Sequence, residues 1–137
     1  MKCGAAGIII YKKTLFGKIK FLGLKATKRF AIRGKGIYDI PKGKRDRGEK
    51  PFDCAMRECL EEAGLKPTNV IAGPFKSGDG LWVWLAECNG KPKIRRNPHS
   101  GIKEHLGYKW LTPEQLEKDC LKYLRSSIKW AKKEIGR

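Results

Sequence analysis

The chain has 137 residues, with 31 Lys and Arg against 14 Asp and Glu, which gives a formal net charge of +17 at pH 7. This length predicts one domain with a single core, and a hydrophobic fraction of 40% is enough to fill it. The charge indicates anionic partners, although a basic surface also keeps a protein soluble. The five cysteines are odd in number and form no CxxC pair, which argues against a disulfide framework or a zinc site and predicts reduced, mainly buried thiols.

The first apolar run extends from Cys3 to Ile10 and is closed by Lys12 and Lys13. It is too short for a membrane span or for the core of a signal peptide, so we expect a buried strand there. The sequence therefore predicts no membrane partner and a cytoplasmic location.

Apolar and aromatic runs separated by turns predict a series of short strands. These strands are Ala5–Tyr11, Lys18–Ala26, Gly36–Ile40, Asn69–Phe75, Leu81–Cys88 and Gly107–Leu111. One helix is expected from Pro51 to Ala63, and a final helix begins at Thr112 and Pro113 and keeps helical apolar spacing to Ile135. This order predicts an α/β fold in which a mixed β-sheet lies between helices.

The helix from Pro51 to Ala63 has a proline suited to its first position and a glycine, Gly64, suited to the left-handed residue after its end. Lys50 offers no small capping side chain, which weakens the helix start. Its apolar residues predict one buried stripe. They are Phe52, Met56, Cys59, Leu60 and Ala63.

Three carboxylates, Glu58, Glu61 and Glu62, lie one helical turn apart on this helix, within an arc of about 100°. Like charges this close repel, and a divalent cation between them would relieve the repulsion, because hard oxygen ligands suit magnesium, manganese or calcium. On helix spacing alone, a solvated face paired with lysines is the favoured alternative. The turn-rich loop from Pro41 to Glu49 precedes the helix and carries glycines and cations suited to phosphate.

The spacing from Gly43 to Leu65 resembles the Nudix box: glycine, five residues, glutamate, seven residues, Arg-Glu, an apolar residue, any residue, Glu-Glu, any residue, glycine and an apolar residue. Every fixed position is filled, with Cys59 as the only unusual residue at an apolar position. The resemblance extends to Cys3–Tyr11, to Gly36–Gly43 and to Glu104–Leu111. It implies the Nudix α/β/α sandwich and reverses the preference for a solvated acidic face.

The resemblance implies metal-assisted attack of water on a diphosphate linkage, with Mg²⁺ as the cofactor and Mn²⁺ as an alternative. It implies that Glu58, Glu61 and Glu62 are metal ligands and catalytic residues. Around them, Glu49 is expected to pair with Arg57, which is counted with the catalytic residues. Gly43 and Gly64 support the box, Gly43 by letting the backbone bend beside the metal.

Outside the box, Glu104 is a candidate ligand or general base, with an exposed loop carboxylate as an equal alternative. His105 is left outside the predicted site, because a lone histidine is more often a surface or packing residue. The predicted substrate-binding residues are Lys42, Gly43, Lys44, Tyr38 and Tyr108. Trp82 and Trp84 alternate on one strand and could stack a base, but core packing is the commoner role of such residues.

The run from Tyr38 to Gly43 and the segment from Glu104 to Trp110 resemble those of the diadenosine polyphosphate hydrolases, which makes a dinucleoside polyphosphate the first substrate prediction. An RNA 5′-end pyrophosphohydrolase or decapping enzyme is the alternative, supported by a similar Pro-Lys-Gly-Lys run and by the positive charge. A non-catalytic, nucleic-acid-binding Nudix module is a further alternative. It would be expected to lack box glutamates, and all of them are present here.

Overall fold

The structure is a computed structural model that describes residues 3–26, 37–96, 98, 101 and 104–136. The strands are β1 (Ala5–Lys13), β2 (Ile19–Ala26), β3 (Tyr38–Asp39), β4 (Lys42–Lys44), β5 (Asn69–Lys76), β6 (Leu81–Glu87) and β7 (His105–Leu111). The helices are α1 (Pro51–Ala63), α2 (Pro113–Asp119), the 3₁₀ turn η1 (Lys122–Leu124) and α3 (Arg125–Ile135). Gly36, the predicted start of the third strand, lies outside the described residues.

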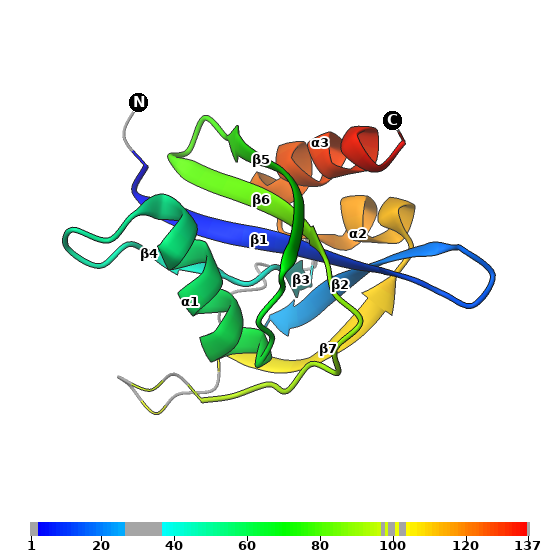
Figure 1. The fold of residues 1–137 in the computed structure, drawn as a ribbon, viewed down its shortest axis with the longest axis horizontal. Coiled ribbons are helices and arrows are strands. Elements are labelled where there is room, and N and C mark those ends of the chain that lie inside the picture. The colour runs from blue at the N-terminus through cyan, green and yellow to red at the C-terminus, as the bar shows by residue number, and fades with distance from the viewer. Residues whose placement is uncertain (1–2, 27–36, 97, 99–100, 102–103, 137) are drawn as a thin grey trace.

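All the strands join one mixed sheet in which β1 is central (Figure 1). The main path runs β3-β2-β1-β6-β5, while β4 pairs with β1 and β7 pairs with β2. β1 and β6 are parallel, from Ala5 opposite Leu81 to Tyr11 opposite Glu87, and the other pairings are antiparallel. The register brings β4, directly before α1, against the start of β1.

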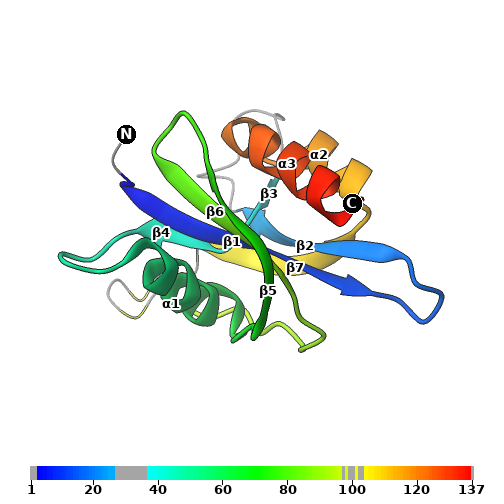
Figure 2. The same ribbon diagram turned by 45° about the horizontal axis from the view of Figure 1, so that its top comes forward.

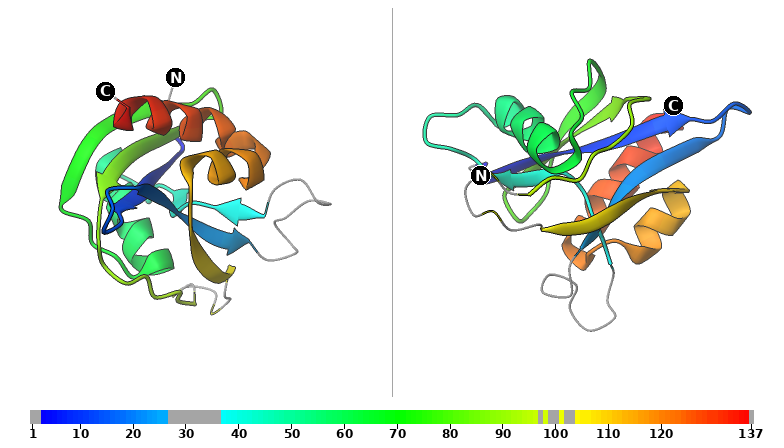
Figure 3. Two further views of the ribbon diagram at one scale, coloured as in Figure 1. Left: turned by 90° about the vertical axis from the view of Figure 1, so that its right-hand side faces the viewer. Right: turned by 90° about the horizontal axis from the view of Figure 1, so that it is seen from below.

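Helices cover both faces of the sheet, as Figure 2 and the end-on view in Figure 3 show. α1 packs on one face through a cluster that includes Ile8, Leu22 and Cys59, and α2 and α3 pack on the other through a cluster that includes Phe21, Leu116 and Ile128. Alternate residues of β1 point to opposite faces, so one strand supplies both clusters. The predicted α/β/α sandwich is confirmed.

The buried face of α1 differs from the predicted stripe. Phe52 and Leu60 are 38% and 36% exposed, whereas the buried residues are Cys54, Ala55, Cys59 and Ala63. These small side chains let the helix approach the sheet closely, which large residues would prevent. Lys50 makes no capping bond and Gly64 adopts the left-handed conformation with φ of 67°, both as the sequence predicts.

The predicted single C-terminal helix is wrong, because it breaks into α2 and α3 around Cys120 and Leu121. Apolar spacing continues across the break, so periodicity alone could not reveal it. The reason is tertiary: the Leu121 amide donates to the Tyr38 carbonyl at 2.8 Å, and the Ile37 amide donates to the Asp119 carbonyl at 2.8 Å. These bonds to the β3 segment replace helical bonds.

All five cysteines are free thiols, and all except Cys88 are buried, as predicted. Among the residues that the structure describes, none of the helices combines the length and the apolar character needed to cross a bilayer.

Candidate active site

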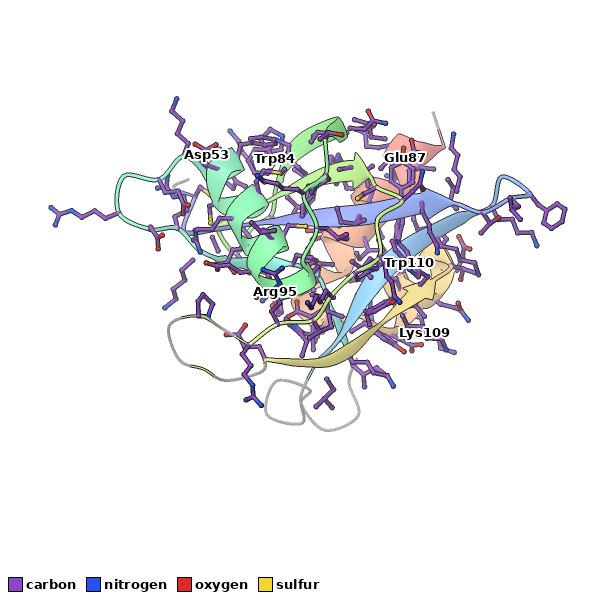
Figure 4. The ribbon with its side chains drawn as sticks, turned by 60° about the horizontal axis from the view of Figure 1, so that its bottom comes forward. Asp53, Trp84, Glu87, Arg95, Lys109 and Trp110 are labelled. Carbon is purple, nitrogen blue, oxygen red and sulfur yellow. The ribbon has the colours of Figure 1, made fainter. Side chains whose placement is uncertain are left out.

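Side chains of α1 meet side chains of two later segments at one hollow beside α1. The hollow has about 240 Å³ of empty space, which includes open solvent at its mouth, and it is lined by Glu58, Glu61, Glu62, Arg95, Pro98, Glu104 and His105. The structure therefore brings the three predicted α1 carboxylates together with Glu104, the candidate acid from the segment before β7. In Figure 4, Arg95 lies near the C-terminal part of α1, whereas Asp53 lies at its other end, away from the hollow.

The Glu58 carboxylate lies against the backbone of Gly43 in β4. A Cβ atom added at Gly43 would overlap all three atoms of that carboxylate. Since any other residue carries a Cβ, Gly43 is the residue that lets Glu58 occupy this place. The sequence predicted that Gly43 lets the backbone bend beside the metal. In the structure, Gly43 lets the backbone of β4 and the Glu58 carboxylate approach each other closely.

Glu62 is held from the same strand. The backbone amide of Lys42 donates to Glu62 Oε1 at 2.9 Å, so β4 fixes the direction of this carboxylate. Glu58 and Glu62 are thus both positioned by consecutive residues of β4, Lys42 and Gly43. The predicted loop from Pro41 to Glu49 therefore contains a short strand.

Arg57 links the loop before α1 to the acidic cluster. Its Nε and Nη2 donate to the two oxygens of Glu49 at 2.8 and 3.0 Å, which confirms the predicted Glu49–Arg57 pair. Its Nη1 donates to Glu58 Oε1 and to Glu61 Oε2, each at 3.0 Å. The hydrogen bonds from Arg57 are the main cause that lowers the pKa of Glu49 to about 2. One guanidinium therefore orients three carboxylates.

Burial raises the pKa of two of the carboxyl groups when no cation is bound. Burial is the main cause that raises the pKa of Glu58 to about 7, and Glu61 and Glu104 add repulsion. Burial also raises the pKa of Glu62 to about 10, with Asp39 and Glu58 adding repulsion against the opposing effect of the Lys42 amide. Carboxylates that resist ionisation at neutral pH are stabilised in their charged form by a nearby positive charge.

The donor atoms fit a divalent cation. Ligand atoms of Glu62, Glu104 and His105 lie within 4.8 Å of one another, and Glu58 and Glu61 line the same hollow. Carboxylate oxygens suit Mg²⁺ or Mn²⁺, and the imidazole nitrogen favours Mn²⁺ over Mg²⁺. The structure groups His105 and Glu104 with Glu62, whereas the sequence prediction named Glu58, Glu61 and Glu62 as the ligands.

A buried polar network, which the sequence analysis missed, lies behind His105. His105 is 4% exposed and its Nε2 lies 3.0 Å from Asp39 Oδ2, while Asp39 Oδ1 accepts from the Ile40 amide at 2.8 Å. Asp39 Oδ2 also lies 3.6 Å from Lys42 Nζ. Asp39 and His105 are 66 residues apart, so no local pattern pairs them. A carboxylate on one imidazole nitrogen fixes the orientation of the ring.

The predicted substrate-binding residues fall into different environments. Lys44 is exposed and Tyr108 is half-buried, so both have accessible surface. Lys42 is turned toward Asp39 and the Tyr123 ring; burial lowers its pKa, but Asp39 and Tyr123 outweigh burial and raise it. Tyr38 is 5% exposed within the α2–α3 core cluster, so the prediction that it contacts substrate is not supported by its position.

The strand tryptophans follow the core-packing alternative. Trp84 is buried and meets Phe52 edge-on with ring centroids 5.4 Å apart. Trp82 is half-buried with Lys76 Nζ 4.2 Å from its ring centroid. Arg95 is the more informative residue, because it is the only cation among the described residues that line the acidic hollow. Arg95 was not among the predicted site residues.

Comparison with known proteins shows the family. A model described as NUDIX domain matches residues 1–131. A bis(5'-nucleosyl)-tetraphosphatase [asymmetrical] of Caenorhabditis elegans is 31% identical over 116 residues, covering 77% of this chain and 76% of that protein. A nucleoside triphosphate pyrophosphatase/Nudix hydrolase fusion protein of Bifidobacterium longum is 29% identical over 111 residues, which is 79% of this chain but only 23% of the fusion protein.

Solved structures support the same fold. A crystal structure of a C. elegans Ap4A hydrolase binary complex superposes with a TM-score of 0.66 and 23% identity, covering 96% of this chain and 98% of that one. The box sequence, the sandwich and the family match agree. The chain therefore belongs to the Nudix family and is a hydrolase that acts on phosphorus-containing anhydrides.

Proposed function

We propose that the chain hydrolyses a diphosphate linkage in nucleoside or dinucleoside polyphosphates, with diadenosine tetraphosphate as the preferred substrate. The observation that carries the proposal is the meeting of Glu58, Glu61 and Glu62 with Glu104 at one hollow. The names of the relatives, tetraphosphatases among them, support the substrate class.

The cation would be held by Glu58, Glu61 and Glu62, with Glu104 and His105 completing the donor set. A divalent cation bound there supplies positive charge that neutralises phosphate oxygens and makes a nearby water more acidic. Arg57 and the Lys42 amide hold the carboxylates in place, so little reorganisation is needed when a substrate arrives.

The chain's own residues also account for proton transfer and for phosphate binding. Glu104 lines the hollow and is proposed to accept the proton of the attacking water. Arg95, with its fixed fork of donors, is proposed to bind the phosphate next to the attacked phosphorus. Lys44, exposed on β4, extends this phosphate contact.

The hollow is too small to hold the whole substrate, so only the reacting phosphates are expected to lie at it. The hollow is narrow: the space that admits a water-sized group is about 10 Å³, far below the usual volume of a site for a whole small molecule, about 300 Å³ or more. The nucleoside parts therefore lie outside the hollow, where Tyr108 offers a partly exposed ring. This arrangement places substrate choice outside the box.

A second candidate, hydrolysis at an RNA 5′ end, is favoured by one observation. The net charge of +17 exceeds what a dinucleotide needs, and it suits a longer phosphate chain. In this alternative, water would attack a diphosphate linkage at the RNA 5′ end in the same hollow.

The test is to incubate the pure protein with Mg²⁺ and a panel of dinucleoside polyphosphates, nucleoside triphosphates, nucleotide sugars and triphosphorylated or capped RNA, and to identify the products by mass. The proposal expects the highest kcat/KM on diadenosine tetraphosphate, with ATP and AMP as products. Faster cleavage of capped or triphosphorylated RNA would overturn the substrate assignment. No turnover of any anhydride in the panel would overturn the proposed function as a whole.

A further inference from the structure

The hairpin that joins β1 to β2 ends in two large apolar side chains that are almost wholly in water. Leu15 is 101% and Phe16 is 92% exposed. Figures 1 and 2 show this hairpin projecting beyond the sheet, at the end of the molecule away from α1. The hairpin tip, residues 14–18, is therefore separate from the candidate active site.

The turn itself does not require these apolar residues. The Thr14 amide donates to the Lys18 carbonyl at 2.8 Å, and the Gly17 amide donates to the Thr14 carbonyl at 2.9 Å. Gly17 has φ of 77°, as in a three-residue hairpin connection that ends in a left-handed glycine. Such turns favour polar residues at the two positions before the glycine. The turn therefore holds Leu15 and Phe16 in a defined place although their side chains bury almost no area.

The strands behind the tip carry unbalanced positive charge. Lys12 and Lys20 are direct cross-strand partners, a like-charge arrangement that destabilises a hairpin, and Lys13 and Lys18 are exposed beside them. Only part of this charge is relieved, because Lys12 Nζ lies 4.4 Å from the centroid of the Trp110 ring. An anionic partner would remove the repulsion.

Few carboxylates oppose this charge. The sequence contains no Asp or Glu before Asp39. Glu114, at the start of α2, lines a shallow hollow with Lys18 and Lys20 at the base of the hairpin, and it lies 3.7 Å from Lys132. The hairpin therefore combines a projecting apolar tip with several lysines on the strands directly behind it.

We propose that the hairpin tip docks on an anionic lipid surface. Leu15 and Phe16 enter the boundary between headgroups and acyl chains, while Lys12, Lys13 and Lys18 lie over the lipid phosphates or carboxylates. An RNA strand lying along the lysines would leave the aliphatic Leu15 in water, so lipid accounts for more of the observed features. The sequence-based expectation of no membrane partner considered only spanning segments, and the proposed peripheral contact differs from it. It does not depend on the proposed function.

The test is co-sedimentation with vesicles of phosphatidylcholine alone or mixed with phosphatidylserine. The wild-type protein is expected to bind only the mixed vesicles. Leu15→Ser/Phe16→Ser is expected to weaken binding about tenfold or more, because the inserted apolar area is lost. Lys13→Glu/Lys18→Glu is expected to weaken it by more than about twentyfold, since each surface lysine contributes about fivefold.

The matched control is Lys129→Glu/Lys133→Glu, which makes the same charge change at exposed positions of α3 and is expected to stay within about threefold of wild type. Thermal unfolding checks that each variant is folded, independently of any enzymatic activity. Equal loss in the control and in the lysine variant of the hairpin would overturn the proposal, because the effect would then be general electrostatics.

Insertion itself has a separate readout. Phe16→Trp is expected to show a blue-shifted emission on the mixed vesicles and quenching by brominated acyl chains, relative to wild-type protein with its native tryptophans. The proposal is overturned if wild type fails to bind the mixed vesicles, if the serine variant binds like wild type, or if the hairpin variants lose RNA binding while vesicle binding is unchanged.

Discussion

Replacement of Gly43 by alanine tests the close approach between β4 and Glu58. The new Cβ would overlap the Glu58 carboxylate, which is the far end of a flexible side chain and can turn away. Ordinary carbon contacts are about 3.5–4.0 Å, so the carboxylate must move by about 1 Å. Gly43→Ala is therefore expected to leave the fold intact but to displace one carboxylate from the hollow.

The magnitudes follow from this geometry. Alanine restricts the unfolded chain more than glycine does, which stabilises the folded state by about 0.4–1 kcal/mol. This gain offsets much of the cost of moving Glu58. The free energy of unfolding should thus change by less than about 1 kcal/mol. A displacement of about 1 Å at a catalytic group costs about 100-fold in rate, so kcat on diadenosine tetraphosphate should fall by that order.

The assay compares Gly43→Ala with Gly4→Ala, a control at which an added Cβ meets nothing within 4 Å, and with the variant Glu58→Ala. If Gly43→Ala acts through Glu58, combining it with Glu58→Ala should add no further loss of kcat. Wild-type kinetics in Gly43→Ala, or a loss that adds fully to that of Glu58→Ala, would refute the reasoning.

Three further predictions concern charge. Burial raises the pKa of Glu62 to about 10 in the metal-free protein, so the folded state binds more protons than the unfolded chain and stability falls as pH rises from about 4.5 through neutrality. In EDTA, Glu62→Gln should therefore be more stable than wild type by about 1 kcal/mol or more at mildly alkaline pH, with the difference vanishing in thermal unfolding at acid pH; a less stable variant would be inconsistent with the raised pKa. Asp39→Asn should weaken Mg²⁺ affinity about 10- to 100-fold by freeing the His105 ring, and an unchanged titration would remove Asp39 from the site. Hydrolysis of diadenosine tetraphosphate should depend only mildly on salt, whereas binding of an RNA strand with about six phosphate contacts should fall by orders of magnitude between low and physiological salt; tight RNA binding at high salt would favour the RNA alternative.

Local signals were sufficient where local chemistry determines structure. Pro51 and Gly64 mark the ends of α1 correctly, and Thr112 forms the predicted cap with its hydroxyl accepting from the Gln115 amide at 3.1 Å. The box spacing also predicted the Glu49–Arg57 pair.

The remaining features depend on contacts between distant segments. β4 has the sequence Lys-Gly-Lys, typical of a turn, and becomes a strand only because Ala6 and its neighbours in β1 pair with it. The break before α3 depends on bonds to Tyr38. The fold brings three further residues to the site from distant parts of the sequence, and no local spacing predicts this. They are Asp39, His105 and Arg95.

The most direct test of the central claim is the Mg²⁺-dependent turnover of diadenosine tetraphosphate by wild type, Glu62→Gln and Asp53→Asn. Both variants replace a carboxylate by an amide on α1, but Asp53 is exposed in its first turn, away from the hollow (Figure 4). We predict that wild type and Asp53→Asn release ATP and AMP at similar rates, while Glu62→Gln remains folded and loses orders of magnitude in kcat. Undiminished turnover by Glu62→Gln would contradict the assignment of the acidic hollow as the active site.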